Sequence, residues 1–206
     1  AWALANTKSK GLETRSYRFD FSNGLSATGV WLKAMTTADT APATLLLSDS
    51  GKKTLAAEAS DRINRGEQVL ALDLLFFGDA APQTPAAFAW TQLLASAGDR
   101  PLGLEAAQLI ALTRWLQAPR TRLETSGPRT QVVARVAATL EPKLFSEVQT
   151  RAGMTSLRHL LDAPIDYQAA PDLFCLDLFH NLLLVFPKDF HDDKDQLDQQ
   201  ILQEPY

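Results

Sequence analysis

TRLETSGPRTQVVARVAATL, residues Thr121–Leu140, is the stretch that decides the fold. It begins with a short run that suits a strand, Arg122–Thr125, and continues into a tight turn, Ser126-Gly127-Pro128-Arg129. From Thr130 to Leu140, apolar residues recur at helical spacing. The stretch therefore predicts a strand, a sharp turn and a helix. In sheets of parallel strands, ligands bind at the carboxyl ends of the strands, so this turn is the first place to look for a site.

A connection of this kind carries the nucleophile in serine hydrolases with the motif G-x-S-x-G. The same frame here reads Gly127-Pro128-Arg129-Thr130-Gln131. Gly127 fills the first glycine position, but Arg129 stands where the serine is required and Gln131 where the second glycine is required. A guanidinium stays protonated and cannot attack a carbonyl carbon. Arg129 could bind a carboxylate, and a solvated or structurally paired arginine is the role we expect.

Three hydroxyl groups lie near this turn, on Thr125, Ser126 and Thr130. A serine nucleophile needs an exposed hydroxyl at the sharp turn, a histidine within hydrogen-bond reach, and backbone donors for the oxyanion. Ser126 is the best of the three candidates. It precedes Gly127 instead of following a glycine by two, so its side chain should point away from the apex of the turn.

Candidates for the other two catalytic groups lie near the C-terminus. Residues 187–193, PKDFHDD, follow the strand-like run Leu182–Phe186 and place His191 among Asp189, Asp192 and Asp193. Doubly wound hydrolases carry the acid after a late strand, in the chain order Ser, Asp, His. Ser126, Asp189 and His191 are therefore the candidate catalytic set, with His180 as a second histidine. The alternative interpretation of the acidic cluster is a hydrated loop.

Other motifs in the sequence are incomplete. The loop Ser48–Thr54 could be a phosphate-binding loop, but Leu46 stands where that motif needs glycine and Lys53 where it needs Ser or Thr. None of the three histidines pairs with another at helical spacing, which leaves a histidine-based metal site without support. The single cysteine, Cys175, excludes an internal disulfide and a multi-thiolate site. We expect no metal and no organic cofactor.

Composition narrows the classes of partner. The net charge is −4 and the sequence pI is about 5.4, with lysines and arginines scattered along the chain, so a nucleic-acid interface is not expected. The sequence has no run of 18 uncharged apolar residues, so we expect no membrane-spanning helix. It also shows no signal-peptide pattern, and its start at Ala1 is typical of a processed or excised segment. The apolar share of 46% is sufficient for one large core.

The order of the remaining elements predicts an α/β fold. Asn23-Gly24 separates two alternating runs, which is a strong hairpin signal. Apolar strand-like runs then alternate with helical segments, which is typical of a mostly parallel, doubly covered sheet with antiparallel strands at one edge. The expected strands are Glu13–Phe21, Leu25–Lys33, Thr44–Leu47, Gln68–Phe77 and Phe145–Arg151, and the expected helices are Thr54–Arg65, Ala86–Ala97 and Leu104–Gln117. We expect residues 1–12 to be a linker or the end of a preceding element, 13–187 the domain, and 188–206 a polar tail or terminal helix.

Several segments together resemble bacterial α/β-hydrolases of the acetyl xylan esterase-like or dienelactone hydrolase-like group. More specifically, they are similar to the degenerate hydrolase domain in the C-terminal half of some longer members. The resemblance covers about residues 13–179. The segments that carry it are VLALDLLFFGD, the long helix ending in LTRWLQ, LETSGPRTQVVARVAATLEP, the following strand with LRHLLD, and YQAAPDLFCLDLF.

The resemblance implies an eight-stranded sheet and, for active members, deacetylation of plant polysaccharide through a serine. It places the nucleophile position on Arg129 and the oxyanion loop on Asp49-Ser50-Gly51, without the HGGG pattern. The acid falls near Asp189 or Asp192, and the eighth strand and its histidine have no clear counterpart before Tyr206. The sheet is therefore expected to lack its last strand.

Three hypotheses about function follow. The first is a catalytically inactive hydrolase module that serves an upstream hydrolase domain of the same protein or binds a carbohydrate ester. The second is a working carboxylic-ester hydrolase with an unorthodox serine, Ser126. The third is a non-enzymatic interaction domain. The resemblance suggests export to the periplasm or the extracellular space, whereas the chain itself does not indicate a compartment.

Overall fold

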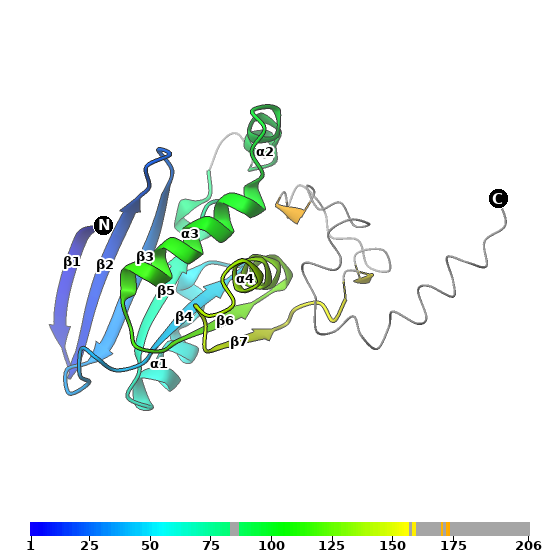
Figure 1. Cartoon of the computed structure of the whole chain (residues 1–206). Helices are drawn as coiled ribbons and strands as arrows, with labels where there is room; N and C mark the ends of the chain where they lie inside the picture. The colour runs from blue at the N-terminus through cyan, green and yellow to red at the C-terminus, as the bar shows by residue number, and fades with distance from the viewer. Residues whose placement is uncertain (83–86, 157, 160–169, 171, 174–206) are drawn as a thin grey trace, which may run out of the picture.

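A computed structural model describes residues 1–82, 87–156, 158–159, 170 and 172–173 (Figure 1). The described residues form one seven-stranded sheet with the order β1-β2-β3-β5-β4-β6-β7. The strands are β1 Trp2–Ser9, β2 Leu12–Asp20, β3 Ser26–Ala34, β4 Ala43–Ser48, β5 Gln68–Asp73, β6 Thr121–Ser126 and β7 Glu147–Arg151. The α-helices are α1 Ala56–Asn64, α2 Ala87–Ser96, α3 Pro101–Leu116 and α4 Pro128–Leu140.

The sheet has a parallel half and an antiparallel half. Strands β5, β4, β6 and β7 run parallel, whereas β1, β2 and β3 form an antiparallel meander that joins the parallel half through β3 and β5. Every residue of β4 and of β5 is buried, which explains why these strands read as continuous apolar runs. The predicted α/β fold with its mostly parallel centre and antiparallel edge is confirmed.

The first strand corrects the prediction that residues 1–12 are a linker or the end of a preceding element. Trp2–Ser9 is a strand that pairs with β2, and the two-residue loop Lys10-Gly11 joins them with φ angles of 50° and 79°. Two positive φ angles are typical of the tight hairpin turns that match strand twist. The sequence gives little sign of this strand, because all eight of its residues are exposed and none has to be apolar.

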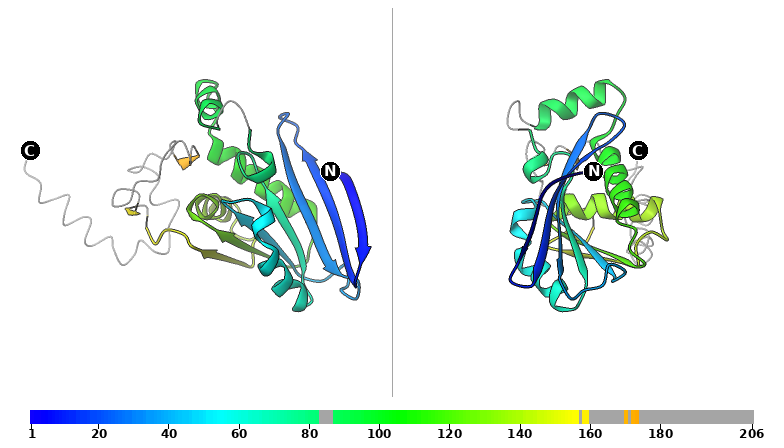
Figure 2. Two further views of the ribbon diagram at one scale, coloured as in Figure 1. Left: turned by 180° about the vertical axis from the view of Figure 1, so that it is seen from behind. Right: turned by 90° about the vertical axis from the view of Figure 1, so that its left-hand side faces the viewer.

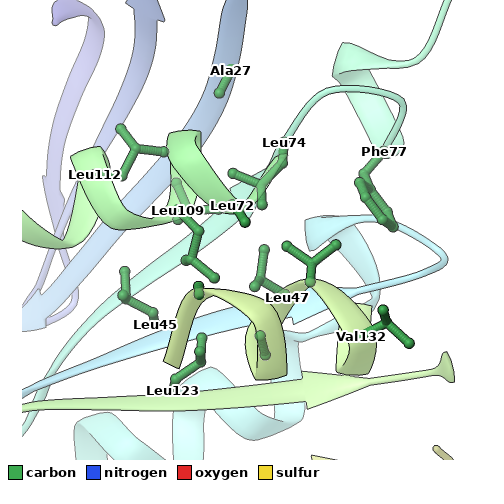
Figure 3. Close-up of a cluster of buried hydrophobic side chains, with 14 of the residues drawn as sticks. Ala27, Leu45, Leu47, Leu72, Leu74, Phe77, Leu109, Leu112, Leu123 and Val132 are labelled. Atoms are coloured by element: carbon green, nitrogen blue, oxygen red, sulfur yellow. The ribbon is translucent and has the colours of Figure 1, made fainter. Parts of the chain in front are cut away.

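Helices cover both faces of the sheet (Figure 2). Helix α1 lies on one face, where it buries a small cluster with Leu46, Val69 and Ala71. Helices α3 and α4 lie on the other face over the main core, part of which Figure 3 shows. The labelled core side chains are Ala27, Leu45, Leu47, Leu72, Leu74, Phe77, Leu109, Leu112, Leu123 and Val132.

Two predicted boundaries can be compared with the structure. Strand β5 ends at Asp73 and not at Phe77, because the chain turns sharply there, with positive φ at Phe76 and Gly78. Leu74 and Phe77 stay buried as loop residues in the main core. Helix α1 ends as predicted just before Gly66, which has a φ of 79°.

Several predictions fall outside the described residues. These are the strand-like run Leu182–Phe186, the absence of a last strand, the tail over 188–206, and Cys175. In the part of the chain that is described, no helix is long and apolar enough to cross a membrane.

Candidate functional site

The predicted strand, turn and helix lie at the carboxyl end of the parallel strands. Strand β6 ends at Ser126, Gly127 makes the turn with φ 112° and ψ 160°, and α4 begins at Pro128. Arg129 therefore lies in the first turn of the helix and not at the apex. The residue with the unusual backbone, where a nucleophile elbow holds its serine, is Gly127. The motif alignment sets Arg129 on the serine position. The apex of the turn, at Gly127, lies two residues before Arg129.

The N-terminus of α4 is capped by a carboxylate from another strand. Asp49, which follows β4, accepts hydrogen bonds from the backbone N–H of Arg129 (3.0 Å) and from the backbone N–H and the hydroxyl of Thr130 (both 2.8 Å). The helix N-terminus attracts anions because its first N–H groups have no partner in the helix and its dipole favours negative charge. Here the protein's own carboxylate fills that place.

The cap depends on the absence of a side chain at Gly127. A Cβ atom at Gly127 would lie 2.3 Å from Cγ of Asp49, closer than two such atoms approach. The carboxylate occupies the space beside the turn into which the side chain of a residue at position 127 would project. The next residue, Pro128, has no N–H to donate.

The loop after β4, aligned with an oxyanion loop, also has its donors occupied. The N–H of Asp49 donates to the carbonyl of Ser126 (3.0 Å), and that of Gly51 donates to the carbonyl of Ser48 (2.9 Å). The N–H of Ser50 donates to the hydroxyl of Ser48 at 3.2 Å. All three residues expected to form an oxyanion loop thus direct their amides to acceptors within the protein.

Arg129 is structurally paired, as expected. Its Nε donates to Oδ1 of Asp172 at 2.7 Å, and its guanidinium carbon lies 4.3 Å from the ring centroid of Phe77. Its Nη2 also reaches the carbonyl of Phe76 at 3.4 Å. Asp172 is fully buried, and burial raises the pKa of its carboxyl although the Arg129 guanidinium opposes the shift. The arginine side chain is only 12% exposed and joins α4 to two other segments.

Gln131, aligned with the second glycine of the motif, holds the loop after β7. Its Nε2 donates to the carbonyl of Met154 at 2.7 Å, and its Oε1 accepts from the N–H of Met154 at 2.6 Å. Gly153 permits this contact, since a Cβ there would lie 2.5 Å from Oε1 of Gln131. The Gln131 side chain is buried, and both of its polar atoms form hydrogen bonds with the backbone of Met154.

Ser126 faces away from α4. Alternate residues of a strand share a face, so Ser126 shares a face with Glu124. Glu124 forms an ion pair with Arg62 of α1, whereas α4 covers the opposite face with Leu123. Alternation along β6 therefore places Ser126 on the α1 face of the sheet, and the predicted orientation of its side chain relative to the apex stays a prediction.

The histidines cannot be placed beside this turn. His159 is exposed. His180, His191, Asp189 and Asp192 lie outside the described residues, so the proposed triad stays a prediction.

A second polar cluster adjoins the site at the ends of β4 and β5. Lys52 donates from Nζ to Asp73 (2.6 Å), to Asp79 (2.8 Å) and to the hydroxyl of Thr28 (2.8 Å). Hydrogen bonds from Lys52 and Lys53 lower the pKa of the Asp79 carboxyl to about 2. The sequence of this loop suggests an incomplete phosphate loop and, by resemblance, an oxyanion loop, but it does not predict a buried ammonium at Lys52. The carboxylates of Asp73 and Asp79 in this cluster bind the ammonium group of Lys52.

The chemistry available at the β6 turn is limited. Among the described residues, no group of His, Cys, Asp and Glu side chains could hold a metal ion. The charged side chains Asp49, Arg129 and Lys52 are each engaged with other groups of the chain. The arrangement fixes the turn in one conformation, and we find no oxyanion donor in the described part of the turn.

Comparison with known proteins bears on the fold. The chain matches no protein-family model and no curated protein. Among solved structures, it is similar to a candidate acetyl xylan esterase from Bacteroides fragilis NCTC 9343, with a TM-score of 0.60 and 13% identity over 71% of this chain and 46% of that one. It is also similar to a cold-adapted esterase from an Arctic intertidal metagenomic library, with a TM-score of 0.51 and 14% identity over 73% and 64%.

An epoxide hydrolase from an endophytic Streptomyces gives a TM-score of 0.50, with 19% identity over 69% of this chain and 37% of that one. At such identities the likeness shows the fold alone. The chain has an α/β-hydrolase fold, and it spans less than two thirds of the length of each of these three proteins.

Proposed function

We propose that this chain is a non-catalytic α/β-hydrolase domain, related to carbohydrate esterases such as acetyl xylan esterases. The observation that carries the proposal is the position of Asp49. Its carboxylate accepts the N–H groups of Arg129 and Thr130, and so fixes a negative charge at the start of α4, beside the turn where an acyl-transferring hydrolase stabilises a developing oxyanion. A negative charge fixed at that place opposes the formation of a second one.

The turn itself supports the same conclusion. Gly127 at the apex has no side chain to act as a nucleophile, and Pro128 lacks the N–H that would serve as an oxyanion donor in the residue after the nucleophile. Removing one member of a catalytic triad typically lowers kcat by several powers of ten. Loss of both the nucleophile and the donors leaves this turn with a structural role.

Hydrolysis of p-nitrophenyl acetate tests the proposal. The folded chain, Ser126→Ala, Arg129→Ala and the matched control Ser22→Ala, which alters an exposed turn, should all give the rate of buffer alone. Circular dichroism confirms that each variant is folded. Turnover by the parent chain and Ser22→Ala that Ser126→Ala abolishes would contradict the proposal and establish the ester hydrolase with an unorthodox serine.

The accessory role needs a partner, and we propose an upstream esterase domain of the same protein or the acetylated polysaccharide on which such a domain acts. Affinity electrophoresis in gels that contain acetylated or deacetylated xylan separates the two. Retardation only by acetylated xylan supports binding of the carbohydrate ester. Equal mobility in both gels contradicts it and leaves the upstream domain as the proposed partner.

A further inference from the structure

Strand β1 lies at the edge of the sheet and pairs on one side only (Figure 1). On its outer side, no strand among the described residues is paired with it. All eight of its residues are exposed, and the side chains of Trp2 and Leu4 are 67% and 64% exposed. An unpaired edge of this kind is a template for the addition of another strand.

The protections that usually prevent such pairing are weak in β1. Natural edge strands are short, charged, interrupted by proline or covered by another element. This strand has no proline, and its only charged residue, Lys8, lies 3.8 Å from Glu13 of the neighbouring strand. The register shifts between Ala3 and Ala5, and that bulge disrupts only the first part of the strand. Residues Ala5–Ser9 keep a regular register.

We infer that β1 pairs antiparallel with β1 of a second copy of this chain, with Thr7 of each copy facing the other on the two-fold axis. This register uses the whole regular segment, because it sets Ala5 against Ser9 and Asn6 against Lys8. A two-fold axis at Lys8 would set two ammonium groups against each other. An axis nearer the N-terminus would draw the bulge at Leu4 into the pairing. The two sheets would become one continuous sheet.

The residues at the two ends of the paired segment favour β1 of a second copy, rather than a strand of another protein, as the partner of β1. In this register, Trp2 lies beside the hairpin turn Lys10-Gly11 of the other copy. Gly11 has open space around it, since a Cβ atom there would have no neighbour within 4 Å, and Lys10 offers a cation to the indole face. The same kind of contact occurs within the sheet, where Lys33 Nζ lies 5.5 Å from the ring centroid of Trp31.

Sedimentation velocity of the full chain tests the inference. At high micromolar concentration the parent chain should have twice the monomer mass of 22.6 kDa. Thr7→Lys and Thr7→Glu should each be monomeric, because like charges then meet on the axis. An equimolar mixture of these two variants should restore the dimer, and the matched control Thr7→Val should remain dimeric. A monomeric parent chain, or a dimer that Thr7→Lys leaves intact, would overturn the inference.

A disulfide trap tests the register independently. Opposed residues in an antiparallel pair lie about 4.5–5.5 Å apart at Cα, within the range that a disulfide spans. Thr7→Cys in a Cys175→Ser background should therefore form a covalent dimer on mild oxidation. Asn23→Cys in the same background, at an exposed turn, is the control and should stay monomeric. Equal yields from the two variants would contradict the pairing. Neither experiment depends on esterase activity, so its outcome is separate from that of the proposed function.

Discussion

The turns after β4 and β6 lie side by side at the carboxyl end of the sheet, and a carboxylate from another strand end stabilises each of them in a different way. After β4, Asp73 of β5 accepts from the N–H of Lys52 (2.6 Å) and also from its ammonium (2.6 Å). After β6, Asp49 accepts two helix amides and one hydroxyl, and no described cation pairs with it. One turn is held by a buried ion pair and the other by a helix N-terminus.

This difference shows how the site is closed to an outside anion. Asp73 accepts a backbone hydrogen bond from the turn after β4. Asp49, which belongs to that turn, accepts backbone hydrogen bonds from the start of α4. Glycines allow both approaches, since a Cβ at Gly51 would lie 2.9 Å from Cα of Gly78 and one at Gly127 would meet Asp49. The two turns are thus linked through backbone amides, and neither offers these amides to a ligand.

The largest expected effect is at the ion pair. Lys52→Met removes a 7% exposed ammonium and leaves the buried carboxylate of Asp73 without its cation. Breaking a buried pair from one side should lower the free energy of unfolding by about 3–5 kcal/mol. Urea denaturation measures this value. A loss of unfolding free energy no greater than that caused by replacing the exposed Lys53 would contradict a stabilising role of the buried ion pair in the turn after β4.

The next effect is at the helix cap. Asp49→Ala leaves the N–H groups of Arg129 and Thr130 without an acceptor, and it should lower the free energy of unfolding by about 2–3 kcal/mol. The matched control Asp49→Asn keeps one side-chain oxygen and should lose about half as much. Urea denaturation of the two variants beside the parent chain gives both values. Equal losses of unfolding free energy in the two variants would contradict the role of the Asp49 side-chain oxygens as acceptors for the backbone N–H groups.

A smaller effect is the pH dependence of the free energy of unfolding that Asp79, the other carboxylate bound to Lys52, contributes. The pKa of Asp79 is about 2, below its unfolded value of about 3.9, so its ionised form stabilises the fold. That contribution is complete above about pH 5 and is lost as the pH falls toward 2. The difference in unfolding free energy between the parent chain and Asp79→Asn should therefore shrink from about pH 5 to about pH 2.5. A constant difference would contradict the assignment.

The smallest effect is at Lys53, whose side chain is 78% exposed although it lies 2.6 Å from Asp79. Because water screens an exposed pair, Lys53→Ala should change the free energy of unfolding far less than Lys52→Met does. Thermal unfolding of the two variants side by side gives the comparison directly. A loss as large as that of Lys52→Met would mean that exposure does not distinguish the two lysines.

The sequence predicts the parts of the fold that local patterns determine. Asn23-Gly24 between alternating runs predicts the β2–β3 hairpin, and the run around Gln68–Asp73 predicts a strand buried on both faces. Strand β1 could not be predicted in the same way. Its pairing depends on β2 and on the Lys10-Gly11 turn, whose first residue is not one that favours positive φ.

The site is predictable in position but not in its contacts. The turn at Gly127 follows from Thr121–Leu140 alone. Its alignment with a serine motif is two residues out of step, because only the backbone angles show which residue forms the apex. The cap by Asp49 joins residues 80 and 81 positions apart, and the pair Arg129–Asp172 spans 43 positions. No local pattern encodes such contacts, since each depends on how the strands are ordered in the sheet.

Labelling with a fluorophosphonate, which reacts covalently with activated serines, tests the central claim most directly. Intact-mass measurement of the folded chain should show no adduct beyond that of the chain unfolded in urea. We expect this result because Gly127 has no side chain to act as a nucleophile, Pro128 has no N–H to donate to an oxyanion, and Asp49 fixes a negative charge at the start of α4. A stoichiometric adduct that peptide mapping places on Ser126, and that unfolding abolishes, would show that the turn is a working active site.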